Sequence, residues 1–162
     1  MKKLLFISFT VLIMTLSSCK QESKETALSI PFEKYTLPNG LTVIINEDHS
    51  DPIAAVAVYY HVGSSREVPG KTGFAHLFEH MMFQRSENVG EDELFKNIME
   101  AGGTLNGSTS QDRTNYYQVV PKNAIEMVLW MESDRMGYLE NTVTKAAFVN
   151  QQNVVPVSYT HL

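Results

Sequence analysis

Residues 72–84, TGFAHLFEHMMFQ, combine a helical pattern of apolar side chains with two histidines and a glutamate. Apolar residues recur there at three- and four-residue spacing, which predicts an amphipathic helix. The residues of its apolar face are Phe74, Leu77, Phe78, Met81 and Met82. The rest of the domain must cover such a face, so we expect this helix to be packed.

His76 and His80 are four residues apart, so on a helix both imidazoles share a face and can reach one ion. This donor set predicts zinc (Zn2+), because imidazole and carboxylate ligands suit a tetrahedral zinc site with one open position. Glu79 lies beside them and could take a proton from a water bound there. The alternative is a surface helix with two solvent-exposed histidines. The pattern should arise by chance in roughly one per cent or fewer of chains this long, which favours the metal site.

Strand signals surround this helix. Two β-rich runs flank Pro38-Asn39-Gly40, which predicts a hairpin within residues 35–45. Residues 53–62, IAAVAVYYHV, are apolar throughout and predict a strand buried on both faces. Residues 63–73 contain several glycines and a proline and predict a loop.

The second half of the chain alternates helices and strands. We expect a helix over 92–101, paired strands over 104–110 and 114–120, and a helix from Pro121 to Gly137. One face of that last helix holds Ala124, Met127, Val128 and Met131. Strands interrupted by helices, with hairpins among them, indicate an α+β fold with a largely antiparallel sheet and packed helices.

The first 31 residues have the layout of a lipoprotein export signal. Residues 1–18 contain two lysines, an apolar run and small residues, and predict a signal peptide. Cys19, the single cysteine, stands where a lipobox is lipidated, and residues 19–31 form a polar tether. The chain is therefore expected in the bacterial cell envelope, held on a membrane by a lipid anchor and facing outside the cytoplasm, in the periplasm or on the surface. The alternative is an ordinary signal peptide with an incidental cysteine.

The composition argues against one class of partner. The formal net charge is -5, and no basic cluster follows Lys2 and Lys3. We therefore expect no nucleic-acid partner.

Several segments together resemble the pitrilysin/insulinase family of zinc peptidases, whose inverted motif has the order of His76, Glu79 and His80. The other matching segments are 37–41 (LPNGL), 62–67 (VGSSRE), 106–117 (NGSTSQDRTNYY) and parts of 129–136 (LWMESDRM). The resemblance covers residues 32–155, as the N-terminal domain of such a peptidase.

The resemblance implies a zinc-dependent endopeptidase that hydrolyses peptide bonds. His76 and His80 would bind the zinc and Glu79 would be the general base. Asn106, Gly107, Ser108 and Thr109 would form an exposed strand edge to which a substrate peptide or small protein adds. Family members have two homologous halves, in one chain or in two subunits, so this chain would be an incomplete copy of one half-domain.

The chain departs from the family near its end. Residues 151–155, QQNVV, begin the pattern that carries the third zinc ligand, a glutamate expected at position 158, where Ser158 stands. Pro156 should break that helix within a turn. Residues 156–162, PVSYTHL, resemble foreign or read-through sequence, as if the family sequence were truncated after Val155.

The missing third ligand lowers the activity that we expect of this chain. We expect the chain as written to bind zinc weakly and to have little or no activity. One alternative is a catalytically silent binding or assembly subunit of the same family, although such members usually lose the motif that is intact here. Another is a stand-alone lipoprotein domain ending at Leu162.

Overall fold

The computed structural model describes residues 29–159, which fall into two compact units with the boundary between Asp48 and His49. The first unit is an antiparallel hairpin of β1 (Glu33–Thr36) and β2 (Thr42–Ile45). Gly40 has a φ of 90°, a left-handed conformation that suits glycine at this tight turn. The predicted hairpin is confirmed.

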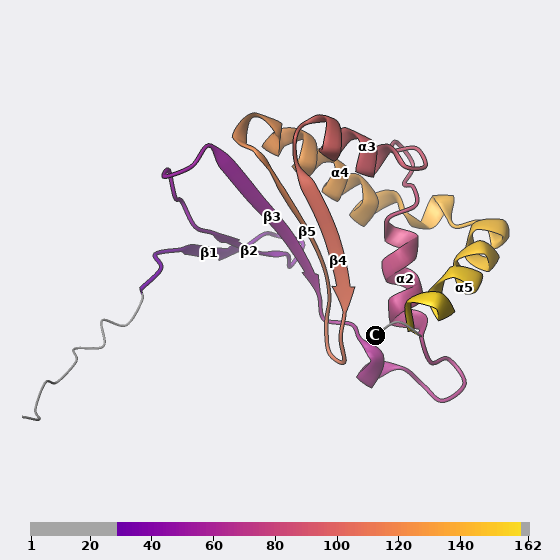
Figure 1. Ribbon diagram of the computed structural model, residues 1–162. Coiled ribbons are helices and arrows are strands. Elements are labelled where there is room, and N and C mark those ends of the chain that lie inside the picture. The colour runs from indigo at the N-terminus through magenta and orange to yellow at the C-terminus, as the bar shows by residue number, and fades with distance from the viewer. Residues whose placement is uncertain (1–28, 160–162) are drawn as a thin grey trace, which may run out of the picture. The chain divides into compact units, whose positions relative to one another are not determined.

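The second unit contains a three-stranded antiparallel sheet with the order β3-β5-β4 (Figure 1). Its strands are β3 (Ile53–Tyr60), β4 (Thr104–Thr109) and β5 (Thr114–Pro121). The β4–β5 hairpin confirms the strand pair predicted from the sequence. Since β5 lies in the middle, β4 occupies one edge of this sheet.

The burial of β3 differs from the prediction. Its residues alternate between exposed and half-buried, with Ile53 55% and Tyr59 67% exposed, so the strand is not buried on both faces. Within this unit β3 lies at the end of the sheet and packs one face against α4. An apolar run alone does not distinguish a two-sided buried strand from an end strand whose outer residues are also apolar.

The helices gather on one side of this sheet (Figure 1). They are α2 (Phe74–Met82), α3 (Glu93–Glu100), α4 (Ile125–Tyr138) and α5 (Lys145–Tyr159), with short 3-10 turns η1 (Ser64–Arg66), η2 (Lys122–Ala124) and η3 (Glu140–Thr142). The core between helices and sheet contains Val89, Leu94, Ile98, Val120, Ala124, Val128 and Met131. The fold is α+β with antiparallel sheets, as predicted.

Two helices differ in detail from their predictions. On α2, Leu77 and Met81 are buried as expected, but Phe78 is 45% exposed and lies outside the packed face. The helix predicted from Pro121 begins later, because Pro121 has an extended ψ of 144° and closes β5 before η2. The α-helical part starts at Ile125.

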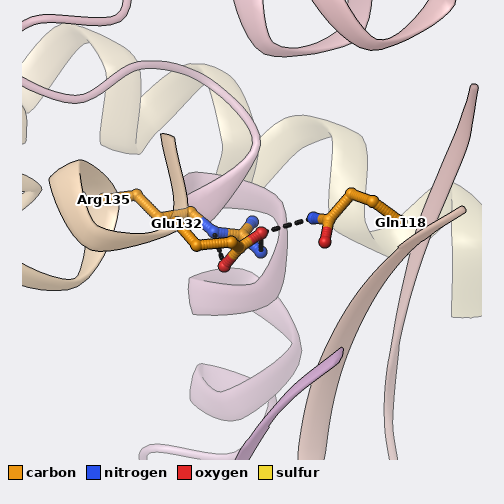
Figure 2. A network of polar contacts seen from close by, with 3 residues as sticks. All are labelled: Gln118, Glu132 and Arg135. Atoms are coloured by element: carbon orange, nitrogen blue, oxygen red, sulfur yellow. Dashed lines mark hydrogen bonds and ion pairs between the residues drawn. The ribbon is translucent and has the colours of Figure 1, made fainter. Parts of the chain in front are cut away.

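The inner face of α4 continues from its apolar core residues into a buried ion pair (Figure 2). The Arg135 guanidinium donates through Nε to Glu132 at 2.8 Å, and Gln118 of β5 donates to the same carboxylate. All three side chains are at most 3% exposed. Arg135 also lies over the ring of Tyr116, 4.2 Å from its centroid. The network joins α4 to the middle strand of the sheet.

The last described helix, α5, runs through Pro156 and includes three further residues, less than one turn. The predicted break within a turn of Pro156 therefore stays a prediction. The predicted signal peptide, Cys19 and the tether up to residue 28 lie outside the described residues. Within residues 29–159, no helix is both long and apolar enough to cross a membrane.

Candidate active site

The N-terminus of α2 is held by an acidic side chain from the preceding loop. The Glu67 carboxylate accepts hydrogen bonds from the backbone N–H groups of Gly73 and Ala75, both at 2.8 Å. These donors lie in the first turn, where N–H groups have no partner within the helix. The negative charge also lies at the positive end of the helix dipole. Glu67 thus fixes the start of the helix that carries the two histidines.

His76 and His80 lie one turn apart on α2, and both are half-buried. Their Nε2 atoms are 3.2 Å apart and their ring centroids are 4.8 Å apart. Two nitrogens bound to one tetrahedral zinc at about 2.0–2.1 Å would be about 3.3 Å apart. The separation therefore fits two ligands of a common zinc ion.

The environment of His80 favours the form that binds metals. Burial lowers the pKa of His80 below its usual value, and the charge of His76 lowers it further. The Glu79 carboxylate and a side-chain hydrogen bond with Gln151 act in the opposite direction. A metal ligand must be a neutral imidazole, so the net lowering keeps His80 available down to a lower pH.

Gln151 brings α5 to the histidine pair. Its side chain is 5% exposed, and the hydrogen bond to His80 joins α5 to α2. Position 158 follows Gln151 by seven residues, close to two helical turns, and so belongs to the same face of α5. The sequence indicates this segment as the source of a third ligand, but the Gln151–His80 contact itself was not predicted.

The set of metal ligands is incomplete in the described part of the chain. Between residues 29 and 159, no three His, Cys, Asp or Glu side chains cluster in a way that could hold a metal ion. Catalytic zinc sites usually have three protein ligands and a water. The two imidazoles fit zinc, and the third protein ligand is not found in this range.

Glu79 faces β4. Its side chain is only 9% exposed, and the Thr109 hydroxyl donates a hydrogen bond of 2.5 Å to its Oε2 atom. The structure therefore joins two residues that the sequence separates by thirty positions. Both are predicted site residues, and this contact between them was not predicted.

Asn106, Gly107, Ser108 and Thr109 all belong to β4, the edge strand beside α2. Among the described strands β4 pairs only with β5, so its other edge has the geometry that strand addition requires. A Cβ on Gly107 would lie 2.9 Å from the ring of Phe83, which directly follows α2. Glycine therefore permits the close approach of β4 to the end of α2. The binding role of these four residues stays a prediction.

Comparison with known proteins places these features in a family. The family described as insulinase (peptidase family M16) matches residues 42–154. The zinc protease PqqE of Helicobacter pylori is 33% identical over 156 residues, which cover 95% of this chain and 34% of that protein. A probable mitochondrial-processing peptidase subunit beta of Arabidopsis thaliana is 32% identical over 120 residues, 74% of this chain and 22% of that protein.

Solved structures agree with these matches. The crystal structure of a protease from Helicobacter pylori superposes with a TM-score of 0.74 at 32% identity, covering 77% of this chain and 30% of that chain. The chain thus spans no more than about a third of the length of these relatives.

Proposed function

The chain belongs to the insulinase family of peptidases, M16, and on that premise we propose that it is the N-terminal part of a zinc-dependent endopeptidase. One observation carries the proposal. On α2, two imidazoles have the spacing of zinc ligands, and the adjacent Glu79 carboxylate is held against the edge strand β4. Metal ligands, proton acceptor and peptide-binding edge are therefore contiguous.

His76 and His80 would hold the zinc through their Nε2 atoms. When bound, zinc supplies a Lewis acid that polarises the scissile carbonyl and acidifies water. Glu79 accepts the proton of the attacking water and returns it to the leaving nitrogen. Its low exposure limits competing hydration of the carboxylate.

The substrate would be an extended peptide or a small protein. Its backbone would add at Asn106, Gly107, Ser108 and Thr109, along the edge of β4 that no described strand occupies. Main-chain hydrogen bonds give affinity in this mode, so the tolerated range of peptide sequences is wide. A second homologous half, in the same chain or in a partner subunit, would close over the bound strand.

A specific observation favours a second candidate, a catalytically silent binding or assembly subunit. Position 158 carries serine, and no third metal ligand is found among the residues that the structure describes. A site with two protein ligands binds zinc less tightly than one with three. The intact Glu79 argues for the peptidase, since a silent subunit has no use for a general base.

One experiment separates the two candidates. We would compare the parent chain, the Ser158→Glu variant and the double variant that combines Ser158→Glu with Glu79→Gln. For each we would measure bound zinc and the hydrolysis of a set of fluorogenic peptides. Glu79→Gln is expected to keep its zinc and lower kcat by at least about 100-fold, the usual contribution of a general base. Glu100→Gln, at an exposed position on α3, is the control for loss of a carboxylate. Undiminished hydrolysis by the Glu79→Gln variant contradicts its role as base, and absence of zinc from every variant supports the silent subunit.

We also propose that lipidated Cys19 holds the protein in the bacterial cell envelope. The supporting feature is the position of the single cysteine directly after an apolar, small-residue leader. Metabolic labelling with a fatty acid and detergent phase partition should both detect the anchor. Cys19→Ser should abolish both signals, and labelling that persists in this variant contradicts the anchor.

A further inference from the structure

The Thr109 hydroxyl occupies the point where β4 meets α2. Its Oγ1 atom lies 2.5 Å from Oε2 of Glu79 and 3.2 Å from Oγ1 of Thr114 on the neighbouring strand. Thr114 in turn donates to the backbone carbonyl of Val62 at 3.1 Å. Two hydroxyl groups and one carboxylate oxygen therefore form a short chain that runs from the sheet to α2.

The available protons determine the direction of this chain. A threonine hydroxyl has one proton to donate. The 2.5 Å contact with the carboxylate is the shorter one, and hydrogen bonds to an ionised acceptor are about twice as strong as neutral ones. Thr109 therefore gives its proton to Glu79. Thr114 keeps its own proton for the Val62 carbonyl or for the oxygen of Thr109.

We propose that Thr109 is a positioning residue for Glu79: its hydroxyl fixes Oε2 and leaves Oε1 as the oxygen that accepts the proton of water. Among the described residues, no hydrogen bond to Oε1 is found, whereas Oε2 is engaged. The inference rests on the proposed role of Glu79 as general base. It adds to Thr109 a side-chain role that is separate from the peptide-binding role of its backbone.

The position of Thr109 on β4 gives this contact a further consequence. The same strand supplies the edge to which a peptide would add. The backbone of Thr109 would therefore bind the peptide, while its side chain holds the carboxylate of Glu79. A peptide added to β4 and the Oε2 atom of Glu79 would therefore both be positioned by this strand.

Two variants of Thr109 test the inference. Thr109→Val keeps the branched shape and removes the hydroxyl, whereas Thr109→Ser keeps the hydroxyl. Thr104→Val makes the same change at an exposed position at the start of β4 and serves as the matched control. Thr109→Ala is a second hydroxyl-free variant in case the valine chain does not fold.

The first readout is NMR of the full chain and needs no activity. The parent, Thr109→Ser and Thr104→Val should each hold the Glu79 side chain in one rotamer, with a slowly exchanging hydroxyl proton at position 109 in all three. In Thr109→Val and Thr109→Ala that proton is absent, and the Glu79 side chain should average over several rotamers. A single fixed Glu79 rotamer in both hydroxyl-free variants overturns the inference.

The second readout is peptide hydrolysis with zinc in the Ser158→Glu background. Thr109→Val should lower kcat about 10- to 100-fold, the usual effect of removing an outer-shell partner at a metal site, with KM and bound zinc unchanged. Thr109→Ser should restore kcat. Equal kcat for Thr109→Val and Thr104→Val overturns the inference. If the zinc-loaded background hydrolyses no peptide, the proposed function fails, and the NMR result alone decides whether Thr109 positions Glu79.

Discussion

The Glu67 carboxylate accepts a hydrogen bond from the backbone N–H of Ala75 at 2.8 Å, although the two residues are eight positions apart. Its second oxygen binds the N–H of Gly73, also at 2.8 Å. Gly73 itself provides no side-chain cap, and α2 has only nine residues. Short helices are marginal without such support. Glu67 therefore stabilises the helix on which His76 and His80 stand.

Removing the Glu67 carboxylate should weaken α2. We expect Glu67→Ala to lower the free energy of unfolding by about 1–2 kcal/mol, the upper range for loss of a helix cap, and Glu67→Gln to lower it less because one acceptor oxygen remains. Urea unfolding followed by circular dichroism measures both. Glu100→Ala, at an exposed position, should stay within about 0.5 kcal/mol of the parent. A Glu67→Ala chain that unfolds like the Glu100→Ala control shows that the cap contributes nothing.

A carboxylate at position 158 should complete the zinc site. Gln151 touches His80, and position 158 belongs to the same face of α5. We expect Ser158→Glu to tighten zinc binding more than about 10-fold, since loss of a mere outer-shell partner already costs 10- to 100-fold. Competition with a chromogenic chelator at constant pH measures the affinity.

The control for Ser158→Glu is Gln152→Glu, which adds the same charge at an exposed position of α5. It should leave the zinc affinity within about twofold of the parent, because long-range attraction between exposed charges is largely screened. Equal gains in the two variants mean that charge alone attracts the metal. No gain in either contradicts the expected register of α5.

The buried ion pair between Arg135 and Glu132 should be costly to break. Arg135→Met leaves Glu132 buried without its cation, and we expect a loss of about 3–5 kcal/mol in the free energy of unfolding. Arg135→Lys should also destabilise, because an ammonium lacks the planar fork of donors that matches a carboxylate and cannot stack on Tyr116 as a planar group. Thermal and urea unfolding measure these losses, with Lys96→Met at an exposed position of α3 as the control.

A double variant identifies the origin of this loss. Glu132→Met combined with Arg135→Met removes both charges from the interior and should be more stable than Arg135→Met alone. The reason is that the single variant keeps an unpaired buried carboxylate. A double variant less stable than the single one would show that packing around Glu132, and not its charge, determines the loss.

Local signals in the sequence predicted the local parts of this fold. The turn at Asn39-Gly40, helix α2 and the β4–β5 hairpin depend on residues within a few positions of one another, and all are confirmed. The contacts of Glu79 with Thr109 and of Gln151 with His80 join segments far apart in the chain. No spacing rule encodes such contacts, so the sequence yielded the residues but not their pairing.

The ion pair on α4 had a signal that could have been read. Val128, Met131, Glu132 and Arg135 follow the three- and four-residue spacing of one helix face. Charged residues that continue an apolar stripe indicate a buried pair, since isolated charges are rarely buried. The exposure of β3 had no such signal, because its outer residues are as apolar as its inner ones.

Asp134 should make the stability of the domain depend on acid pH. Burial raises the pKa of its carboxyl, but hydrogen bonds from the side chains of Asn88 and Ser86 and from the backbone of Asn88 outweigh burial and leave the pKa below its usual value. The native state therefore binds this proton less readily than the unfolded chain, whose aspartates titrate at about pH 3.9. The stabilisation by Asp134 is complete above that pH and is lost as the pH falls through the lower native pKa.

Urea unfolding at pH 7, 5, 4, 3 and 2.5 tests this dependence. The difference in free energy of unfolding between the parent and Asp134→Asn should be largest at neutral pH and should shrink below about pH 4, because protonated Asp134 loses its advantage as an acceptor. Asp51→Asn, at an exposed position before β3, is the control for loss of one negative charge. A difference that stays constant down to pH 2.5 would mean that Asp134 stabilises by shape and packing. Its hydrogen bonds to Ser86 and Asn88 would then not depend on its charge.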